Sequence, residues 1–496
     1  MQIQVHSGNL KSHPTGVHIL LVFEGESPVD QCHPSLAGPL TSLLASGDFK
    51  GAAGQVTTLY PAQAGPRLVL AGLGPSETLA SSCIRRATAQ AIRAAREIAA
   101  DELTLQLPHC LPAAVTAEAA CEGALLGGYR VHRFDVPGYS PDAPPKLDVL
   151  VDSGQEIYAA REGARIGCAI AAAASLARDL VNTPANYCTP AHLAEAAAAI
   201  PGLRTEILER SDMESLGMGS LLGVAQGSET PPKFIIMEHN ADRADSLDTL
   251  VLAGKGITFD TGGYSMKSVT GMVGMKSDMG GGAAVIGAMQ AISALQPELH
   301  VVGLVPAVDN LVSAQAIRPQ DVLVASNGLS IEIISTDAEG RLILADALVY
   351  AARYEPAAVI DIATLTGSCV TALGSAAAGL FSNHDGLRDD LLAAAGRSEE
   401  RLWPLPLFPD YDKALESQVA DLRNSAAPST GVGTSAAFLQ RFTTCLAWAH
   451  LDIAGVVGIE GLGSIDRSDP LLPEKGATGF GARLFVDLVR HWRSPV

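Results

Sequence analysis

The sequence has few aromatic residues, and it has no apolar run as long as a membrane-spanning helix requires. Aromatic residues make up 5% of its 496 residues, whereas alanine and glycine are abundant. Small side chains favour close packing of helices on a sheet over the packing of two sheets in a β-sandwich. Residues 1–13 lack the charged, apolar and small-residue order of a signal peptide, so we expect a cytoplasmic protein with no membrane partner.

Cysteine pairs of the CxxC type are absent. The eight cysteines are scattered along the chain, at Cys32, Cys83, Cys110, Cys121, Cys168, Cys188, Cys369 and Cys445. In a chain of this length, such scatter argues against a disulfide framework and against a zinc site built from thiolates. We therefore expect reduced thiols, most of them buried.

Positive charge is also scarce. The formal net charge is −19, and no patch rich in lysine and arginine stands out. Proteins that bind nucleic acid need such a patch to neutralise the phosphates, so we do not expect nucleic acid as the main partner. A negative field favours cationic small substrates instead, such as the free amino end of a peptide.

The length of the chain exceeds what one hydrophobic core usually supports, which predicts two domains. In the N-terminal part, strand-like segments at 17–25, 66–74 and 146–154 alternate with a helical segment at 88–102. Residues 158–182 have helical spacing without an interior proline, and the prolines of "NTPANYCTP" end the pattern. We predict an N-terminal α/β domain over 1–155, a linking helix over 156–182 and a larger domain over 183–496.

Strand and helix patterns alternate through the second half. The strand-like segments are apolar on both faces and span 234–240, 249–254, 300–308, 329–335 and 357–365, with helices such as 283–296 and 341–354 between them. This pattern predicts an α/β fold with a central, largely parallel sheet that helices cover on both faces. Ligands of such sheets bind at the carboxyl ends of the strands.

Charged residues gather in Gly-rich turns at these predicted strand ends, in "GKGITFDTGG" (254–263), "MKSDMGG" (275–281) and "TDAEGR" (336–341), which contain no histidine or cysteine. Four carboxylates at one edge would form roughly six like-charge pairs, each costing about 4 kcal/mol at about 4 Å in an effective dielectric of 20. Two divalent cations would neutralise them, as in metal-assisted hydrolysis. The four are Asp260, Asp278, Asp337 and Glu339.

Three basic residues belong to the same turns. Lysine ligates a metal only after its amine loses a proton, and a nearby dication lowers the pKa of that amine, so Lys255 is a candidate ligand. Lys267 and Arg341 would then remain positively charged, and they could stabilise an oxyanion in a transition state or hold a bound anion.

Structural roles remain open for the same turns. An aspartate in a Gly-rich turn is often an Asx-turn or a cap. Thr336 and Glu339 have the spacing of a capping box at a helix start. Lys267 and Lys276 could be solvated loop charges, and for His450 we expect a role in the core rather than metal ligation.

At these residues the sequence resembles the leucine aminopeptidase (cytosol aminopeptidase) family of dimetal exopeptidases. "GKGITFDTGG", "MKSDMGG", "TDAEGRLILADAL" and "DIATLTG" follow the order and spacing of the family's signatures, flanked by "RDLVNTPAN" and "AHLDIAG". The wording is similar to that of the bacterial peptidase B branch. The resemblance implies an N-terminal macro-like α/β domain, a C-terminal catalytic α/β domain and a homohexamer.

The resemblance also implies roles for site residues. Two divalent ions, Zn²⁺ or Mn²⁺, would be held by Lys255, Asp260, Asp278, Asp337 and Glu339, with Asp260 and Glu339 as bridging ligands. Lys267 would polarise the scissile carbonyl. Arg341 would hold a bicarbonate that acts as general base toward water, helped by the backbone at Gly340 and Leu365. The pocket for the N-terminal side chain would be lined by Met275, Thr364 and Gly367.

The function so implied is metal-dependent release of N-terminal amino acids, leucine and other apolar residues first, from peptides. Two alternatives remain open from the sequence: a dimetal phosphatase, since Lys267 and Arg341 would serve either chemistry, and a DNA-binding accessory protein on an aminopeptidase scaffold. Two features depart from the family pattern: Ser335 stands where asparagine is usual, and the segment 455–481 is longer.

Overall fold

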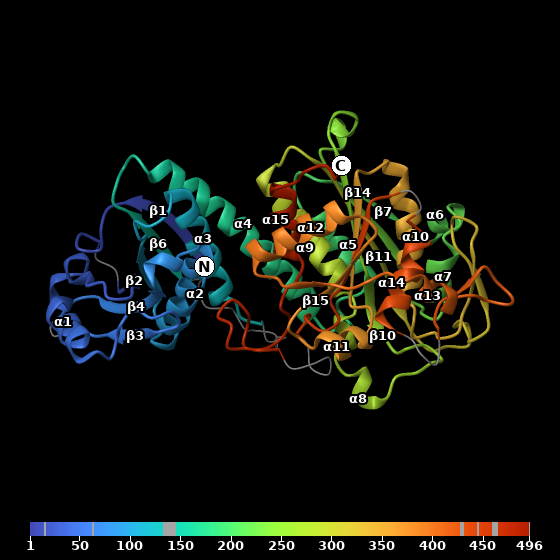
Figure 1. The fold of residues 1–496 in the computed structure, drawn as a ribbon, viewed down its shortest axis with the longest axis horizontal. Helices are drawn as coiled ribbons and strands as arrows, with labels where there is room; N and C mark the ends of the chain where they lie inside the picture. The colour runs from blue at the N-terminus through green and yellow to red at the C-terminus, as the bar shows by residue number, and fades with distance from the viewer. Residues whose placement is uncertain are drawn as a thin grey trace. The chain divides into compact units, whose positions relative to one another are not determined.

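The computed structural model describes residues 1–13, 16–61, 64–131, 145–426, 431–443, 446–458 and 465–495. The chain divides into two compact units, Met1–Ala172 with Arg467–Glu474 and Ala173–Asp466 with Lys475–Val496. The division falls inside α4 (Ile157–Asn182), the long helix that the spacing predicts over 158–182 (Figure 1). Among the described residues, no helix has the length and apolarity needed to span a membrane.

The N-terminal unit is built on a six-stranded sheet of order β1-β6-β5-β2-β4-β3, in which only β3 is antiparallel to its neighbour. The predicted strands at 17–25, 66–74 and 146–154 are confirmed as β2, β4 and β6. The strands are β1 (Gln2–Ser7), β2 (Val17–Phe23), β3 (Val56–Leu59), β4 (Arg67–Gly74), β5 (Glu102–Gln106) and β6 (Lys146–Val151).

Within the described residues of this unit, α4 is preceded by the α-helices α1 (Ala37–Ser46), α2 (Ser81–Glu97) and α3 (Ala113–Gly128). The helix predicted over 88–102 is α2, which begins earlier and ends at Glu97. The predicted end is wrong because Ala99 has a left-handed φ of 50°, which a helix cannot continue through, and Glu102 already begins β5.

The larger unit contains a nine-stranded sheet of order β16-β15-β18-β14-β9-β11-β8-β7, with β10 added beside β11. Its centre is parallel, from β18 through β14 and β9 to β11, and the antiparallel pairs lie toward its two sides. The predicted largely parallel sheet is confirmed. Its strands are β7 (Arg204–Leu208), β8 (Lys233–His239), β9 (Thr249–Gly254), β10 (Gly256–Asp260), β11 (His300–Asn310), β14 (Ala358–Ala363), β15 (Ala378–Ser382), β16 (Leu402–Pro404) and β18 (Trp448–Asp452).

Helices cover both faces of this sheet. Every residue of β9 and β11 is buried, as the apolar pattern on both faces predicts. Helices α9 (Gly280–Leu295) and α10 (Gly340–Ala351) both pack on β9, β11 and β14. The core cluster under α10 includes Val251 and Ala253 but no side chain of α9, which places the two helices on opposite faces.

One predicted strand belongs elsewhere. The segment 329–335 forms only a short strand, β13 (Ser330–Glu332), in a separate three-stranded sheet with β12 (Val322–Val324) and β17 (Leu422–Arg423). Its assignment to the central sheet is wrong. The strand ends at Glu332 because the next backbone N–H groups donate to Asp321 and to the side chain of Asn424 instead of to a neighbouring strand.

Helix α10 also carries a fully buried carboxylate, Asp346. Its two oxygens accept hydrogen bonds from the backbone N–H of Leu221 at 2.8 Å and of Ser326 at 2.7 Å, and it thereby ties two neighbouring segments to the helix. Burial raises the pKa of Asp346 to about 6, because removal from water disfavours the charged form.

This pKa predicts how stability depends on pH. The unfolded chain releases the proton of Asp346 near pH 4, whereas the folded protein keeps it up to about pH 6. The folded state therefore binds more protons in this window, and the contribution of Asp346 to the free energy of unfolding should fall by up to ~3 kcal/mol as pH rises from 4 to 6. Denaturant unfolding of the wild type and of Asp346→Asn at several pH values measures this: the difference between them should change across the window. A constant difference would contradict the prediction.

Candidate active site

A cavity of about 210 Å³ opens at the carboxyl ends of the parallel strands. Lys255 follows β9, Asp260 ends β10, Thr364 follows β14 and Ala454 comes two residues after β18. This is the edge at which parallel sheets bind their ligands. Among the residues that line the cavity are Lys255, Asp260, Lys267, Met275, Asp278, Asp337, Glu339, Arg341, Thr364, Leu365, Gly367, Ser425, Ser435 and Ala454.

Lys255 is the single residue between β9 and β10. Its backbone N–H donates to Ile362 of β14, which fixes the direction of its side chain into the cavity. The ammonium Nζ lies 2.7 Å from Asp278 Oδ2 and 2.8 Å from Glu339 Oε1, and only 3% of the side chain is exposed. A Cβ atom at Gly340 would lie 2.7 Å from this Nζ, so a larger residue there would displace the end of the Lys255 side chain from its present position.

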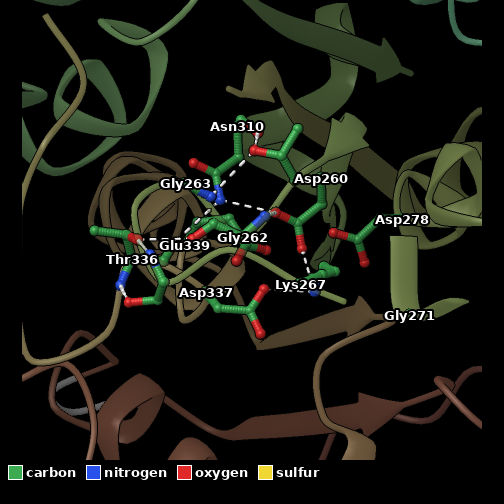
Figure 2. A network of polar contacts seen from close by, with 12 residues as sticks. Asp260, Gly262, Gly263, Lys267, Gly271, Asp278, Asn310, Thr336, Asp337 and Glu339 are labelled. Carbon is green, nitrogen blue, oxygen red and sulfur yellow. Dashed lines mark hydrogen bonds and ion pairs between the residues drawn. The ribbon is translucent and has the colours of Figure 1, made fainter. Parts of the chain in front are cut away.

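Asp260 is held on both of its oxygens (Figure 2). Oδ1 accepts hydrogen bonds from Gly262 N and Asn310 Nδ2, each at 2.8 Å, and Oδ2 lies 2.7 Å from Lys267 Nζ. Lys267 Nζ is also 2.5 Å from Asp337 Oδ1. One carboxylate oxygen from each of Asp260, Asp337 and Glu339 lies within 4.8 Å of the others.

The charges in this cluster shift one another's pKa. Burial, and then the negative charge of neighbouring carboxylates, raise the pKa of Asp337 to about 7, and both effects also raise that of Asp260. Burial would raise the pKa of Glu339 as well, but the two ammonium groups outweigh it and lower that pKa to about 2. For Lys255 and Lys267, burial favours the neutral amine, yet the carboxylates raise both pKa values above the usual one.

The donor set fits divalent cations. Four carboxylates face two ammonium groups, which leaves an excess of negative charge inside a mostly buried pocket. Oε2 of Glu339 is buried and has no hydrogen-bond partner among the described residues. A buried carboxylate oxygen without a donor is costly, and a cation would compensate for it. Carboxylate oxygens are ligands that Mg²⁺ and Mn²⁺ prefer and that Zn²⁺ also accepts.

Arg341 lies at the other side of the same cavity. Its guanidinium donates from Nη1 to the backbone carbonyl of Asn424 at 2.8 Å and from Nη2 to Ser435 Oγ at 2.7 Å, while Nε is buried without a partner among the described residues. Burial lowers the pKa of Arg341 to about 10. The backbone N–H of Leu365 points to Asp452 Oδ1 at 3.3 Å, so Asp452 positions this loop.

The predicted lining of the side-chain pocket also lies in this cavity. Met275, Thr364 and Gly367 all line it, and Ala454, which the sequence did not single out, lies with them. The hydroxyl of Thr364 donates to Asp278 Oδ1 at 2.8 Å, which links the pocket wall to the carboxylate cluster.

The capping-box interpretation of Thr336 and Glu339 is wrong. Helix α10 begins at Gly340, and Glu339 itself is the N-cap residue. The hydroxyl of Thr336 instead donates to Gly262 O at 2.7 Å and accepts from Ser265 N at 2.7 Å. It therefore joins the loop after β10 to the loop before α10.

Ser335, at which the sequence departs from the family pattern, makes a hydrogen bond within this loop. Its hydroxyl accepts a hydrogen bond from the backbone N–H of Asp337 at 3.2 Å.

Lys276, in contrast to Lys267, does not line the cavity, because its amine donates to the backbone carbonyl of Asn182. Within the segment 455–481, residues 459–464 lie outside the described residues.

His450 lies in the core, as expected. It is fully buried on β18, and its Nδ1 is 2.5 Å from Asp361 Oδ1.

The seven cysteines within the described residues are free thiols, as predicted, and four of them are buried; Cys445 lies outside the described residues.

Three buried residues that shape the site were missed from the sequence: Asn310, Asn424 and Asp452. Asp452 had a signal, because it is an acid at the end of an apolar strand in "AHLDIAG". Asn310 had a similar signal, because it ends the apolar strand β11. Asn424 had none, since the loop that it contacts lies about 90 residues away along the chain.

Carboxylates, lysines and an arginine at the carboxyl edge of a mainly parallel sheet are typical of metal-dependent hydrolases. Family models agree in both units: residues 19–135 match the N-terminal domain of the cytosol aminopeptidase family, and residues 175–486 match its catalytic domain. The chain belongs to the cytosol aminopeptidase family. It is a metal-dependent aminopeptidase, and its substrates are peptides.

Individual relatives cover nearly the whole chain. A probable cytosol aminopeptidase of Methylobacillus flagellatus is 41% identical, and the match covers 99% of each chain. Among solved structures, a tomato leucine aminopeptidase variant is similar with a TM-score of 0.84 and 32% identity, covering 99% of this chain and 96% of that one. The bottromycin maturation enzyme BotP, in complex with Mn, is similar with a TM-score of 0.83 and 32% identity over 96% of this chain and 99% of that one.

Proposed function

We propose that this aminopeptidase holds two divalent ions, Zn²⁺ or Mn²⁺, on Lys255, Asp260, Asp278, Asp337 and Glu339. The observation that carries the proposal is the convergence of Asp260, Asp337 and Glu339, whose oxygens lie within 4.8 Å of one another. Asp260 and Glu339 would be ligands shared by the two ions, as the resemblance to the family implies. When bound, such ions polarise a carbonyl and lower the pKa of water from 15.7 toward about 7.

The basic residues have separate roles in the proposal. Lys267 reaches into the cavity between Asp260 and Asp337, so its ammonium can donate to the carbonyl oxygen of the scissile bond as negative charge develops there. Lys255 must release its proton to become a ligand, and the same ions that it binds favour that loss.

Arg341 holds an anion in this proposal, and bicarbonate is the anion that the family resemblance implies. The free Nε of the buried guanidinium supports this role, because it lacks a partner among the described residues. Gly340 and Leu365 would contribute backbone groups, and the anion would accept a proton from water as general base. Met275, Thr364 and Gly367 line a space for the N-terminal side chain, and we propose leucine and other apolar residues as the preferred ones.

Assembly, location and domain limits complete the proposal. We propose a homohexamer in the cytoplasm, with domains at 1–155 and 183–496 joined by a helix over 156–182. The name shared by the relatives, probable cytosol aminopeptidase, supports the location. The comparisons give no support to the phosphatase or to the DNA-binding alternative, and neither is proposed.

Peptide end-blocking tests the proposal. We expect N-acetylation of a leucyl peptide to abolish its cleavage, because the acetyl group removes the basic amine that the acidic pocket and its ions would bind. Amidation of the carboxyl end is the matched control and should change kcat/KM little. Cleavage products are followed by mass spectrometry. Release of residues from the C-terminus, or equal rates for acetylated and free peptides, would contradict the proposed mode of binding.

A further inference from the structure

Asn424 lies directly after β17 and is completely buried. Its side-chain oxygen accepts from the backbone N–H of Ile334 at 2.8 Å and of Ser335 at 3.3 Å. Its side-chain nitrogen donates to the carbonyl of Ser335 at 2.7 Å and of Ala338 at 3.3 Å. Its own backbone carbonyl accepts from Arg341 Nη1 at 2.8 Å. One residue thus makes five hydrogen bonds to the segment 334–341.

These contacts replace a sheet partner. After β13 ends at Glu332, the chain from Ile334 to Ala338 has no neighbouring strand, and buried backbone groups need partners. The amide of Asn424 supplies them on both sides of Ser335. A side chain that both accepts and donates is required, because the loop presents two N–H groups and two carbonyls.

The segment so held carries much of the site. Asp337 and Glu339 both lie in the segment 334–341, and Arg341 at its end donates to the backbone carbonyl of Asn424. A shift of Asn424 would therefore move two carboxylates and the guanidinium together. Asn424 itself does not line the cavity, although its neighbour Ser425 does.

We propose that Asn424 is a positioning residue that sets the placement of Asp337, Glu339 and Arg341. The inference rests on the proposed function, in which Asp337 and Glu339 hold divalent ions. Partners that orient metal ligands typically matter by 10- to 100-fold in metal affinity or activity, and the contacts of Asn424 are of that kind.

Two variants of the full-length chain test this role: Asn424→Ala, which removes the amide, and Asn424→Asp, which nearly keeps its volume but turns the donor into an oxygen facing two carbonyls. Asn383→Ala is the matched control, because Asn383 also accepts from one backbone N–H, that of Trp448, and donates to one carbonyl, that of Leu446, at the start of β18. Mn²⁺ affinity of the chelator-treated proteins is measured by calorimetry, together with kcat, KM and the melting temperature.

We expect both Asn424 variants to lose about 10- to 100-fold in Mn²⁺ affinity or in kcat, with a smaller change in KM, whereas Asn383→Ala changes only the melting temperature. If Asn424→Ala does not fold, the positioning role is judged from Asn424→Asp alone. Asn424 variants that match Asn383→Ala in Mn²⁺ affinity and kcat would overturn the positioning role. Failure of the wild type itself to bind either Mn²⁺ or Zn²⁺ would instead overturn the proposed metal site.

Discussion

Replacement of Glu339 by Gln is expected to remove bound metal and activity together. Glu339 is 2% exposed, one of its oxygens lies 2.8 Å from Lys255 Nζ, and the other has no hydrogen-bond partner among the described residues. Gln keeps the shape but loses the negative charge, and it can place an NH₂ group against the ammonium of Lys255. The loss should exceed the about 100-fold that is typical when only an outer partner of a metal ligand is removed.

A matched control for this variant lies seven residues earlier. Glu332→Gln makes the same chemical change on β13, where the carboxylate pairs with Arg423 and Ser417 and does not line the cavity. Elemental analysis after gel filtration gives the metal content, and hydrolysis of leucine p-nitroanilide gives kcat/KM. Full metal content with full activity in Glu339→Gln would remove this residue from the metal centre.

Lys267→Ala should separate catalysis from binding. Lys267 pairs with Asp260 and Asp337 at 2.7 and 2.5 Å, and 18% of its side chain is exposed in the cavity. Divalent ions would neutralise the two carboxylates without it, so we expect metal content and KM to stay near the wild-type values. The value of kcat should fall by roughly 10²- to 10³-fold, as when one donor to a developing oxyanion is removed.

Lys276→Ala is the control for this second variant, because Lys276 donates to the carbonyl of Asn182 and does not line the cavity. Steady-state kinetics on a leucyl substrate, with metal content measured on the same preparations, distinguishes the two lysines. A large rise in KM with kcat unchanged would mean that Lys267 binds the ground state of the substrate and gives no added stabilisation to the transition state.

The charged residues that meet in the cavity were predicted from the sequence. Lys255, Asp260, Asp278, Asp337 and Glu339 stand in short Gly-rich turns beside apolar strands and helices, and these local patterns indicate both the elements and the edge of the sheet at which they meet. The periodicity of the apolar residues likewise predicted the α/β class, the long helix α4 and the central strands β9, β11 and β14.

Other features depended on tertiary contacts. Residues 329–335 have the apolar pattern of a central strand, yet most of that segment does not pair in any sheet, because Asp321 and Asn424 take its backbone N–H groups. Thr336 has the spacing of a helix cap, but the nearby loop after β10 offers its hydroxyl better partners. In both cases, hydrogen bonds to a segment that is distant in the sequence override the local structural preference.

The sequence by itself therefore predicted which charged residues meet in the cavity, because strand, turn and helix signals act over a few residues and place charged side chains at the strand ends. Only the tertiary structure decided what holds them. Asn310 positions Asp260 from 50 residues away, and Asn424 positions the loop of Asp337 from about 90 residues away. The local sequence does not show which groups such an asparagine will contact, and its role follows from the polar groups that the fold brings within reach of its amide.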